Sequence, residues 1–386
     1  MDHFAPGALR PNTVLNRELE VVSDNKGRWN LPDHRRRSFH TLDQWSRYTI
    51  GLRSHSTMVL EKRADLRIGD LEPVRRMTTS PWFSAMVVLH GPHILHECYA
   101  ADFGPDRLHS IQSITKTMMN LIIGGLLRTG RIALDRRIGD YLPAIGSGYA
   151  NATVQAVLEM NVDNDYMQDF ADPNTGYYAF EDAMGWRLPE AGCAESTIRE
   201  FLLGIRSADP VNRTGRVQYK DANTDVLGWL AERVSGRLLR AHLADIVDAA
   251  GLEHRLVIAT DRNGVPVMDG GGCMTARDLA RYGSLFARRG IGVDGQQVGC
   301  ADFIARCLTG GTGWSSPSDS QRYASHIETD GRWLSHGGYC GQYLMIDTKT
   351  GLVGVYFSVV EDKDGICDDH FTAIYDMFVG IGDLFA

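Results

Sequence analysis

The sequence predicts an α/β fold in which strands near both ends of the chain build one sheet and a mainly helical segment lies between them. Apolar runs at 83–89 and 94–99 flank a Gly-Pro turn, as in a β-hairpin. Strand patterns return near the C-terminus, whereas residues 140–269 show the patterns of helices and loops. We therefore expect an α/β domain formed by residues 76–139 and 270–386, with a mainly α-helical domain at 140–269 between its two halves.

The other elements follow from local patterns along the chain. Residues 1–75 are polar and weakly periodic, and we expect an N-terminal extension that wraps the fold, with a disordered tail as the alternative. The stretch 113–128 is apolar around most of its helical circumference, which predicts a helix buried on nearly all sides and ended by Gly130. The remaining predicted elements are helices near 154–160, 197–205, 222–234 and 238–250, a helix from a capping box at Thr275 and Asp278 to Phe286, strands at 343–346 and 352–360, and a helix near 370–378.

Composition excludes several classes of protein. The chain has 386 residues, 43% hydrophobic and 23% charged, which is ordinary for a globular protein. A net charge of −8 disfavours a nucleic-acid surface, and no apolar stretch is long enough to cross a membrane. The N-terminus lacks a secretory pattern, and the seven cysteines include no Cys-x-x-Cys pair. We expect a cytoplasmic protein that binds neither nucleic acid nor membrane. A homodimer is one option for its oligomeric state.

One short motif combines a nucleophile with a base. Ser113 and Lys116 are three residues apart at the start of the buried helix, so both side chains lie on one helix face. The helix N-terminus stabilises a developing anion, and we expect burial to lower the pKa of Lys116 so that its amine accepts the serine proton. The alternative is a capping serine with a lysine that extends to solvent. The same spacing at Ser23 and Lys26 lies in the polar extension, where nothing would desolvate the lysine.

Two further motifs follow in a fixed order. Tyr219-Lys220-Asp221 precedes a predicted helix, and His336-Gly337-Gly338 is followed by Tyr339. With these three motifs the chain resembles the serine β-lactamase and penicillin-binding-protein superfamily from about residue 80 to 386. It is similar in narrower detail to the 6-aminohexanoate-dimer hydrolases, in the segments 219–226, 165–173, 185–186 and 275–280. The resemblance implies an antiparallel sheet flanked by helices, with an α-helical subdomain.

The resemblance also implies roles for individual residues. Ser113 would be the nucleophile, Lys116 and Tyr219 would take its proton and return it to the leaving group, and the N–H groups of Ser113 and Tyr339 would form the oxyanion hole. The substrate would be a small linear amide or a short carboxyl ester, hydrolysed through an acyl-enzyme. No metal and no organic cofactor are expected.

Departures from the family pattern modify this expectation. Asp221 stands where many members have asparagine, and a carboxylate near Lys116 would favour the ammonium form and shift the role of base to Tyr219. A solvent-facing Asp221 is the alternative. Phe170 replaces a tyrosine that aids amide turnover in the nylon-dimer hydrolases, which affects amides more than esters because a departing amine needs a proton.

Six residues are candidates for substrate binding beside the catalytic set, namely Asp221 and Phe170, which depart from the family pattern, and four others. His336 and Gly338 belong to the third motif, where a charged His336 would bind a substrate carboxylate, and packing beside the strand is the alternative. Glu181 and Trp186 lie in an aromatic and acidic loop at 165–186. This loop is predicted to be a lid whose acids hold a substrate ammonium and whose aromatics flank an aliphatic chain. An aromatic core with solvated acids is the alternative.

Two competing functions remain open at the level of sequence. A D-alanyl carboxypeptidase or a protein that hydrolyses or binds β-lactams shares the three motifs but requires export. A non-catalytic binding protein could retain the scaffold, although the intact set of Ser113, Lys116 and Tyr219 argues against it.

Overall fold

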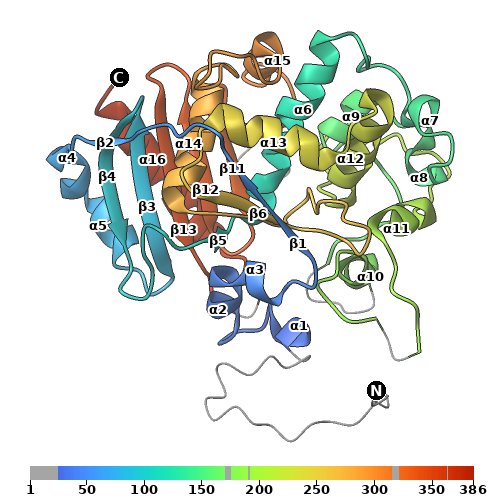
Figure 1. The fold of residues 1–386 in the computed structure, drawn as a ribbon, viewed down its shortest axis with the longest axis horizontal. Coiled ribbons are helices and arrows are strands. Elements are labelled where there is room, and N and C mark those ends of the chain that lie inside the picture. Colours follow the sequence, from blue (N-terminus) through green and yellow to red (C-terminus); the bar gives the residue numbers. More distant parts are fainter. Residues whose placement is uncertain (1–24, 170–174, 190–191, 315–320, 363) are drawn as a thin grey trace, which may run out of the picture.

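A nine-stranded sheet occupies one side of the molecule, on the left in Figure 1, and most of the helices between residues 138 and 250 lie on the other side. The structure, a computed structural model, describes residues 25–169, 175–189, 192–314, 321–362 and 364–386. Neighbouring strands are antiparallel except for β2 and β4, which are parallel. In spatial order the strands are β2 (Glu61–Lys62), β4 (His93–Tyr99), β3 (Phe83–His90), β13 (Leu352–Ser358), β12 (Gln342–Asp347), β11 (Trp333–Gly338), β10 (Ile327–Thr329), β9 (Arg322–Ala324) and β8 (Thr312–Gly313). The predicted α/β class, with an antiparallel sheet built from both parts of the chain, is confirmed.

Helices cover both faces of this sheet, and β3 shows why its sequence is continuously apolar. Ala85, Val87 and Leu89 belong to one hydrophobic core, while Met86 and Val88 belong to a second core on the opposite face. A strand buried on both faces reads as an apolar run and not as an alternation. The first face packs against α14 (Ala276–Ala287), and the second packs against α5 (Glu72–Thr78) and α16 (Asp368–Asp383), with α4 (Leu66–Asp70) beside β4.

A smaller four-stranded sheet connects the N-terminal extension to the rest of the fold. Its spatial order is β1 (Thr49–Arg53), β6 (Arg255–Ala259), β7 (Gly272–Met274) and β5 (His109–Ser110). Because β1 pairs with β6 over five residues, the described part of the extension packs on the fold. The helices α1 (Asn25–Arg28), α2 (Arg35–His40) and α3 (Leu42–Trp45) precede β1. The strand β6 was not among the predicted elements, since its short apolar run does not reveal its pairing partner.

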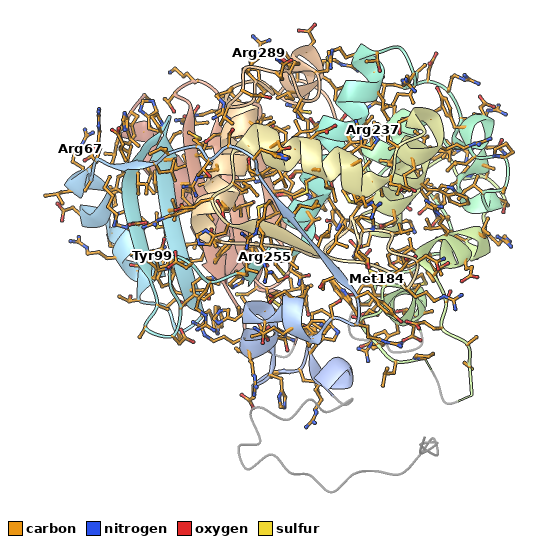
Figure 2. The ribbon with its side chains drawn as sticks, in the orientation of Figure 1. Arg67, Tyr99, Met184, Arg237, Arg255 and Arg289 are labelled. Atoms are coloured by element: carbon orange, nitrogen blue, oxygen red, sulfur yellow. The ribbon has the colours of Figure 1, made fainter. Side chains whose placement is uncertain are left out.

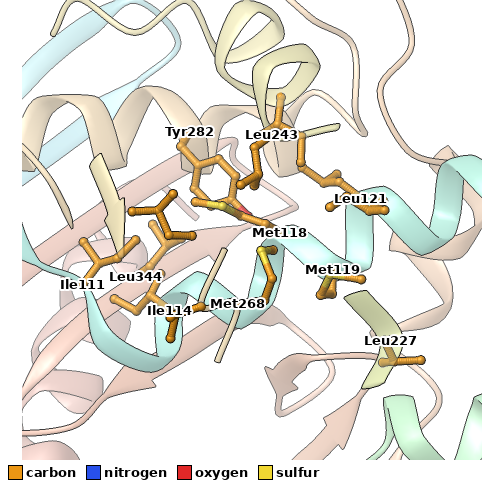
Figure 3. Packing of buried hydrophobic residues seen from close by; sticks show 14 of the residues in the cluster. Ile111, Ile114, Met118, Met119, Leu121, Leu227, Leu243, Met268, Tyr282 and Leu344 are labelled. Atoms are coloured by element: carbon orange, nitrogen blue, oxygen red, sulfur yellow. The ribbon is translucent and has the colours of Figure 1, made fainter. Parts of the chain in front are cut away.

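The apolar stretch after β5 forms the buried helix that the sequence predicts, with one difference at its start. Residues Gln112–Lys116 form a 3₁₀ helix, η2, and the α-helix α6 covers Thr117–Arg128. Met118, Met119 and Ile123 are fully buried, as expected for a helix surrounded by protein. Figure 3 shows side chains of α6 among residues of neighbouring helices, including Leu243 and Tyr282.

Most of the remaining helices lie between β5 and β7 in sequence. They are α7 (Ile138–Tyr141), α8 (Ser147–Ala150), α9 (Val154–Leu158), α10 (Gly176–Ala183), α11 (Ile198–Gly204), α12 (Ala222–Ser235) and α13 (Leu239–Ala250), and α15 (Ala301–Arg306) follows α14. The helices predicted near 154, 197, 222 and 238 therefore occur, with ends shifted by one or two residues. The division into domains at residues 75, 139 and 269 stays a prediction.

The exposed surface is rich in charged side chains. Figure 2 shows Arg67 and Arg289 at the edges of the molecule, and these two residues and Arg237 are exposed. Within the part of the chain that the structure describes, no helix has the length and apolar character needed to cross a membrane.

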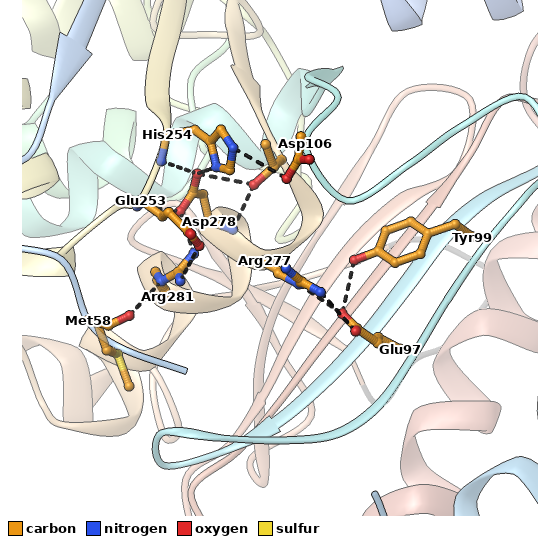
Figure 4. A network of polar contacts seen from close by, with 10 residues as sticks. Met58, Glu97, Tyr99, Asp106, Glu253, His254, Arg277, Asp278 and Arg281 are labelled. Atoms are coloured by element: carbon orange, nitrogen blue, oxygen red, sulfur yellow. Dashed lines mark hydrogen bonds and ion pairs between the residues drawn. The ribbon is translucent and has the colours of Figure 1, made fainter. Parts of the chain in front are cut away.

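The N-cap of α14 offers a test of local stability. The Thr275 hydroxyl accepts a hydrogen bond from the Asp278 N–H at 3.1 Å. The described contacts do not include the second bond of the predicted capping box, from the Thr275 N–H to the Asp278 carboxylate. The Asp278 carboxylate instead accepts from the N–H groups of Glu253 and His254 at 2.8 and 3.0 Å and pairs with Arg281 (Figure 4).

We expect Thr275→Ala to lower the free energy of unfolding by about 1 kcal/mol, because it removes the acceptor for an otherwise unpaired helix N–H. Urea unfolding measures the difference. Thr275→Ser keeps the acceptor and is the matched control. Equal stability of the alanine and serine variants would contradict this account of the cap.

Candidate active site

Ser113 lies in η2, at the junction between the small sheet and the buried helix. The preceding residue, Gln112, has a φ of +46°, which is uncommon for a residue other than glycine and marks a strained turn. Its side chain donates a hydrogen bond to the Ser110 hydroxyl at 2.7 Å, which holds this turn. Ser113 is partly exposed and lines a cavity of about 360 Å³. The turn therefore presents the serine hydroxyl to an accessible space.

Lys116 is fully buried directly behind Ser113. Its Nζ lies 2.9 Å from Ser113 Oγ, 2.5 Å from the carbonyl oxygen of Asp269 and 2.6 Å from Asp221 Oδ1. Ser113 Oγ and the Asp269 carbonyl oxygen accept hydrogen bonds from this amino group, and Asp221 forms an ion pair with it. The alternative of a lysine extended to solvent is excluded, because its side chain has 0% exposure.

The charge state of Lys116 differs from the predicted one. Burial lowers the pKa of Lys116, but the nearby carboxylates of Asp221 and Asp269 raise it by more, so the net pKa lies above its ordinary value. The expectation that burial would leave a neutral amine is therefore wrong for the resting site. The expectation of Asp221 beside Lys116 is correct in geometry, whereas its solvent-facing alternative is not observed.

Two further carboxyl groups lie behind Lys116 and were missed in the sequence. Burial and the nearby Asp269 raise the pKa of Asp225 well above its ordinary value, and burial with Asp221 raises the pKa of Asp269 to about 7. Both shifts favour the protonated form of these buried carboxyl groups. The available signal was an acidic residue among apolar neighbours, at the start of α12 and before Gly270.

Tyr219 completes this group from the opposite side. Lys116 Nζ lies 5.0 Å from the centroid of its ring, and the ring stacks on Trp314 at 5.9 Å. The Tyr219 hydroxyl is buried, and no group among the described residues bonds it with standard geometry. Burial, then Asp221, raises the pKa of Tyr219 well above its ordinary value, while the neighbouring Ser113 hydroxyl lowers it in part. Tyr219 is therefore a protonated phenol beside Ser113.

The third motif lies on β11, and its histidine is buried and uncharged. His336 donates from Nδ1 to the Gly337 carbonyl at 2.6 Å and accepts at Nε2 from the Tyr323 hydroxyl at 3.0 Å. Burial and the nearby Lys116 lower the pKa of His336 to about 3. A neutral, buried imidazole does not bind a substrate carboxylate, so that expectation is wrong and the packing alternative holds.

Gly338 and Tyr339 lie on the cavity wall next to Ser113. A Cβ atom at Gly338 would lie 2.7 Å from the carbonyl oxygen of Ile111, so only glycine lets β11 approach η2 this closely. The Tyr339 phenol accepts from Asn30 Nδ2 at 3.1 Å and donates to the Asp364 carbonyl at 2.8 Å. These bonds connect the N-terminal extension to this wall of the cavity.

The loop residues predicted to bind substrate lie elsewhere. Glu181 is fully buried and pairs with Arg187, and Trp186 packs edge-on against Trp29 at 5.1 Å. Neither residue lines the cavity among its described residues. The aromatic-core alternative describes Trp186, whereas Glu181 is a buried, paired acid and not the solvated one that this alternative expects. Phe170 lies outside the described residues. Gln168 is the loop residue that does line the cavity, and its side chain accepts from the Asp221 N–H at 2.7 Å.

The far wall of the cavity was not predicted. It is formed by the aromatic and acidic side chains of Glu328, Tyr343, Asp368 and Phe371, together with Ile366. The four aromatic and acidic residues come from β10, β12 and the start of α16, and Ile366 precedes α16, so no local pattern in the sequence marks them as neighbours.

Comparisons with known proteins agree with this geometry. The family model described as Beta-lactamase matches residues 84–373. The 6-aminohexanoate-dimer hydrolase of Paenarthrobacter ureafaciens is 32% identical over 313 residues, which are 77% of this chain and 77% of that protein. A Bacillus anthracis structure provisionally named as a 6-aminohexanoate-dimer hydrolase has a TM-score of 0.78 at 19% identity, covering 92% of this chain and 95% of that chain.

A third similarity is more distant. The D-stereospecific amidohydrolase from Streptomyces sp. has a TM-score of 0.57 at 15% identity, covering 82% of this chain and 98% of that chain. At this identity the likeness concerns the fold. Taken with the family match and the curated relative, these findings establish that the chain belongs to the beta-lactamase family and is a serine hydrolase of the amide- or ester-cleaving type.

Proposed function

We propose that this serine hydrolase cleaves a small linear amide or a short carboxyl ester through an acyl-enzyme formed on Ser113. The observation that carries the proposal is the 2.9 Å contact between Ser113 Oγ, at an accessible cavity, and the buried Lys116 Nζ. The relative from Paenarthrobacter, whose name specifies an aminohexanoate dimer, supports a linear amide as the substrate class.

The charge state of the site suggests a route for the serine proton. Lys116 is an ammonium and Tyr219 is a neutral phenol, so neither is a free base in the resting enzyme. Asp221 is the anionic group in contact with Lys116, at 2.6 Å. Transfer of one proton from Lys116 to Asp221 leaves an amine that takes the proton of Ser113 as its oxygen attacks the carbonyl. The oxyanion then carries the negative charge that Asp221 has lost.

The later steps use the remaining residues of the set. The N–H groups of Ser113 and Tyr339 would hold the tetrahedral oxyanion, since both residues line the cavity. Tyr219 keeps its proton at neutral pH and lies beside Ser113, so it is suited to protonate the departing amine or alcohol. Its proton is replaced from Lys116. Water then attacks the acyl-enzyme by the same route in reverse.

The alternative of a β-lactam substrate receives no support from the cavity. Penicillins and cephalosporins carry a carboxylate, whereas the described residues that line the cavity include the acidic groups Glu328 and Asp368 and no lysine, arginine or histidine. We therefore do not extend the proposal to a carboxypeptidase or a β-lactamase.

A fluorophosphonate probe tests the proposal directly, because it reacts with an activated serine and mimics the tetrahedral intermediate. We expect one label per chain, on the peptide that contains Ser113, detected by mass spectrometry after proteolysis. Aminohexanoate oligomers or p-nitrophenyl esters of short acids should be hydrolysed, and a chromogenic cephalosporin should not. Labelling of a different residue, or no labelling together with no hydrolysis, would overturn the proposal.

A further inference from the structure

We propose that Glu328 binds a substrate ammonium and makes the enzyme selective for amides or esters that carry an amino group. The inference rests on the proposed function for one point only, namely that the cavity at Ser113 is where the substrate reacts. It moves the recognition of an ammonium from the loop at 165–186, where the sequence suggests it, to the opposite wall.

The position of Glu328 is fixed next to the third motif. Glu328 lies on β10, and its Oε2 accepts a hydrogen bond from the Gly337 N–H at 3.0 Å. This bond directs the carboxyl group across β11 into the cavity that Ser113 lines. The side chain is 13% exposed, so it is mostly shielded from water but reachable from the cavity.

Glu328 has no cationic partner in the described part of the chain. The nearest basic side chain, His336, has its Nδ1 4.0 Å from Glu328 Oε1, but this imidazole is neutral and donates to the Gly337 carbonyl. The described residues that line the cavity include no lysine, arginine or histidine. A shielded carboxylate without a counter-ion is a site at which an incoming ammonium gains a strong, charge-assisted hydrogen bond.

The surroundings of Glu328 suit an ammonium on an aliphatic chain. The rings of Tyr343 and Phe371 lie 6.2 Å apart beside it and line the same cavity. Aromatic faces attract cations and cover alkyl groups. A Cβ atom at Gly337 would lie 3.3 Å from the Tyr343 ring and 3.4 Å from the Phe371 ring, so glycine keeps space open in front of the two rings. Asp368 also lines the cavity, but it is exposed, so water screens its charge and its contribution is small.

The protonation of Glu328 gives the preference a dependence on pH. Burial raises the pKa of Glu328 to about 7, against the hydrogen bonds from Gly337 and Tyr343. The preference for an ammonium over an uncharged isostere should therefore grow as the pH rises from 6 to 8. The other titratable or charged groups that face Glu328 are His336, with a pKa of about 3, Tyr219, Tyr343, Tyr323 and Lys116, whose pKa values are raised, and the exposed Asp368. Asp269, which is not among the described residues that line the cavity, also has a pKa raised to about 7, so the part of the pH dependence due to Glu328 is the part that Glu328→Gln removes.

Binding of three isosteric ligands tests the inference without relying on turnover. We expect calorimetry on the full chain at pH 8 to give n-hexylammonium an affinity about tenfold higher than that of 1-hexanol, the size expected from one hydrogen bond to a charged group, with hexanoate weaker than both. Glu328→Gln keeps the acceptor for Gly337 and should reduce the preference for hexylammonium about tenfold, to near equality with hexanol. Asp368→Asn is the matched control and should change the preference less than about threefold.

Steady-state kinetics test whether the binding preference also determines which substrate is hydrolysed faster. The ratio of kcat/KM for the p-nitrophenyl esters of 6-aminohexanoate and heptanoate should fall about tenfold in Glu328→Gln. The inference is overturned if the full chain shows no preference for hexylammonium, if Glu328→Gln retains the preference, or if Asp368→Asn removes it equally. Failure of the proposed function is a separate result, namely an unlabelled Ser113, and it leaves the binding preference measurable.

Discussion

Replacing Ser113 by alanine is expected to lower kcat/KM for ester or amide hydrolysis by at least about 10³-fold, because no acyl-enzyme forms without the hydroxyl. The variant should fold normally, since Lys116 keeps its contacts with Asp221 and the Asp269 carbonyl. Initial rates with p-nitrophenyl butyrate, together with a thermal melt, measure both effects. The fluorophosphonate label should disappear at the same time.

The chain offers a matched control for this substitution. Ser23 and Lys26 repeat the Ser-x-x-Lys spacing in the N-terminal extension, so Ser23→Ala removes a serine of the same local motif. We expect Ser23→Ala to hydrolyse esters at the rate of the unmodified protein. If Ser113→Ala also kept that rate, the observed hydrolysis would come from another group, and the mechanism proposed for this cavity would be wrong.

Lys116→Met is expected to remove activity and also to destabilise the fold. The methionine occupies similar volume without a charge, so Ser113 loses its proton acceptor and kcat/KM should fall by about 10³-fold. The same change leaves Asp221 buried without its cation, for which we expect a loss of about 3 kcal/mol in the free energy of unfolding. Urea unfolding and initial rates measure the two losses separately.

The stability loss in Lys116→Met should depend on pH. The pKa of Asp269 is already raised to about 7, and Lys116 is one of the groups that lower it, so removing the lysine raises it further. A carboxyl group whose pKa is higher in the folded state stabilises the fold below its unfolded pKa and loses that contribution as the pH rises. The variant should therefore be weakest above pH 7 and recover toward pH 5.

A second substitution tests whether the destabilisation comes from the unpaired charge. Adding Asp221→Asn to Lys116→Met removes the carboxylate together with the lysine, and we expect this double variant to regain part of the lost stability but none of the activity. A double variant that is less stable than Lys116→Met would show that the two residues do not act as a buried pair.

Local sequence patterns determined much of this molecule. The helix after Ser113, the hairpin at 83–99 and the helices that follow Thr275 and Asp221 have ends close to those predicted, because capping residues and hydrophobic periodicity act over a few neighbouring positions. The Ser113–Lys116 contact could also be predicted from the sequence, because two residues three positions apart on one helix face are neighbours. The family followed from three motifs in order.

The tertiary structure alone decided the electrostatics and the walls of the site. Lys116 is an ammonium because of carboxylates such as Asp221, 105 residues away, and His336 is neutral because it is buried near Lys116, 220 residues away. The sequence suggested Glu181 as a ligand for a substrate cation, but this side chain is buried and paired with Arg187. Glu328 has no local sequence pattern that marks it, yet it lines the cavity. Burial and charge pairing depend on distances between segments that only folding brings together. A sequence pattern therefore identifies the reactive groups, but it does not predict their protonation states or their neighbours in space.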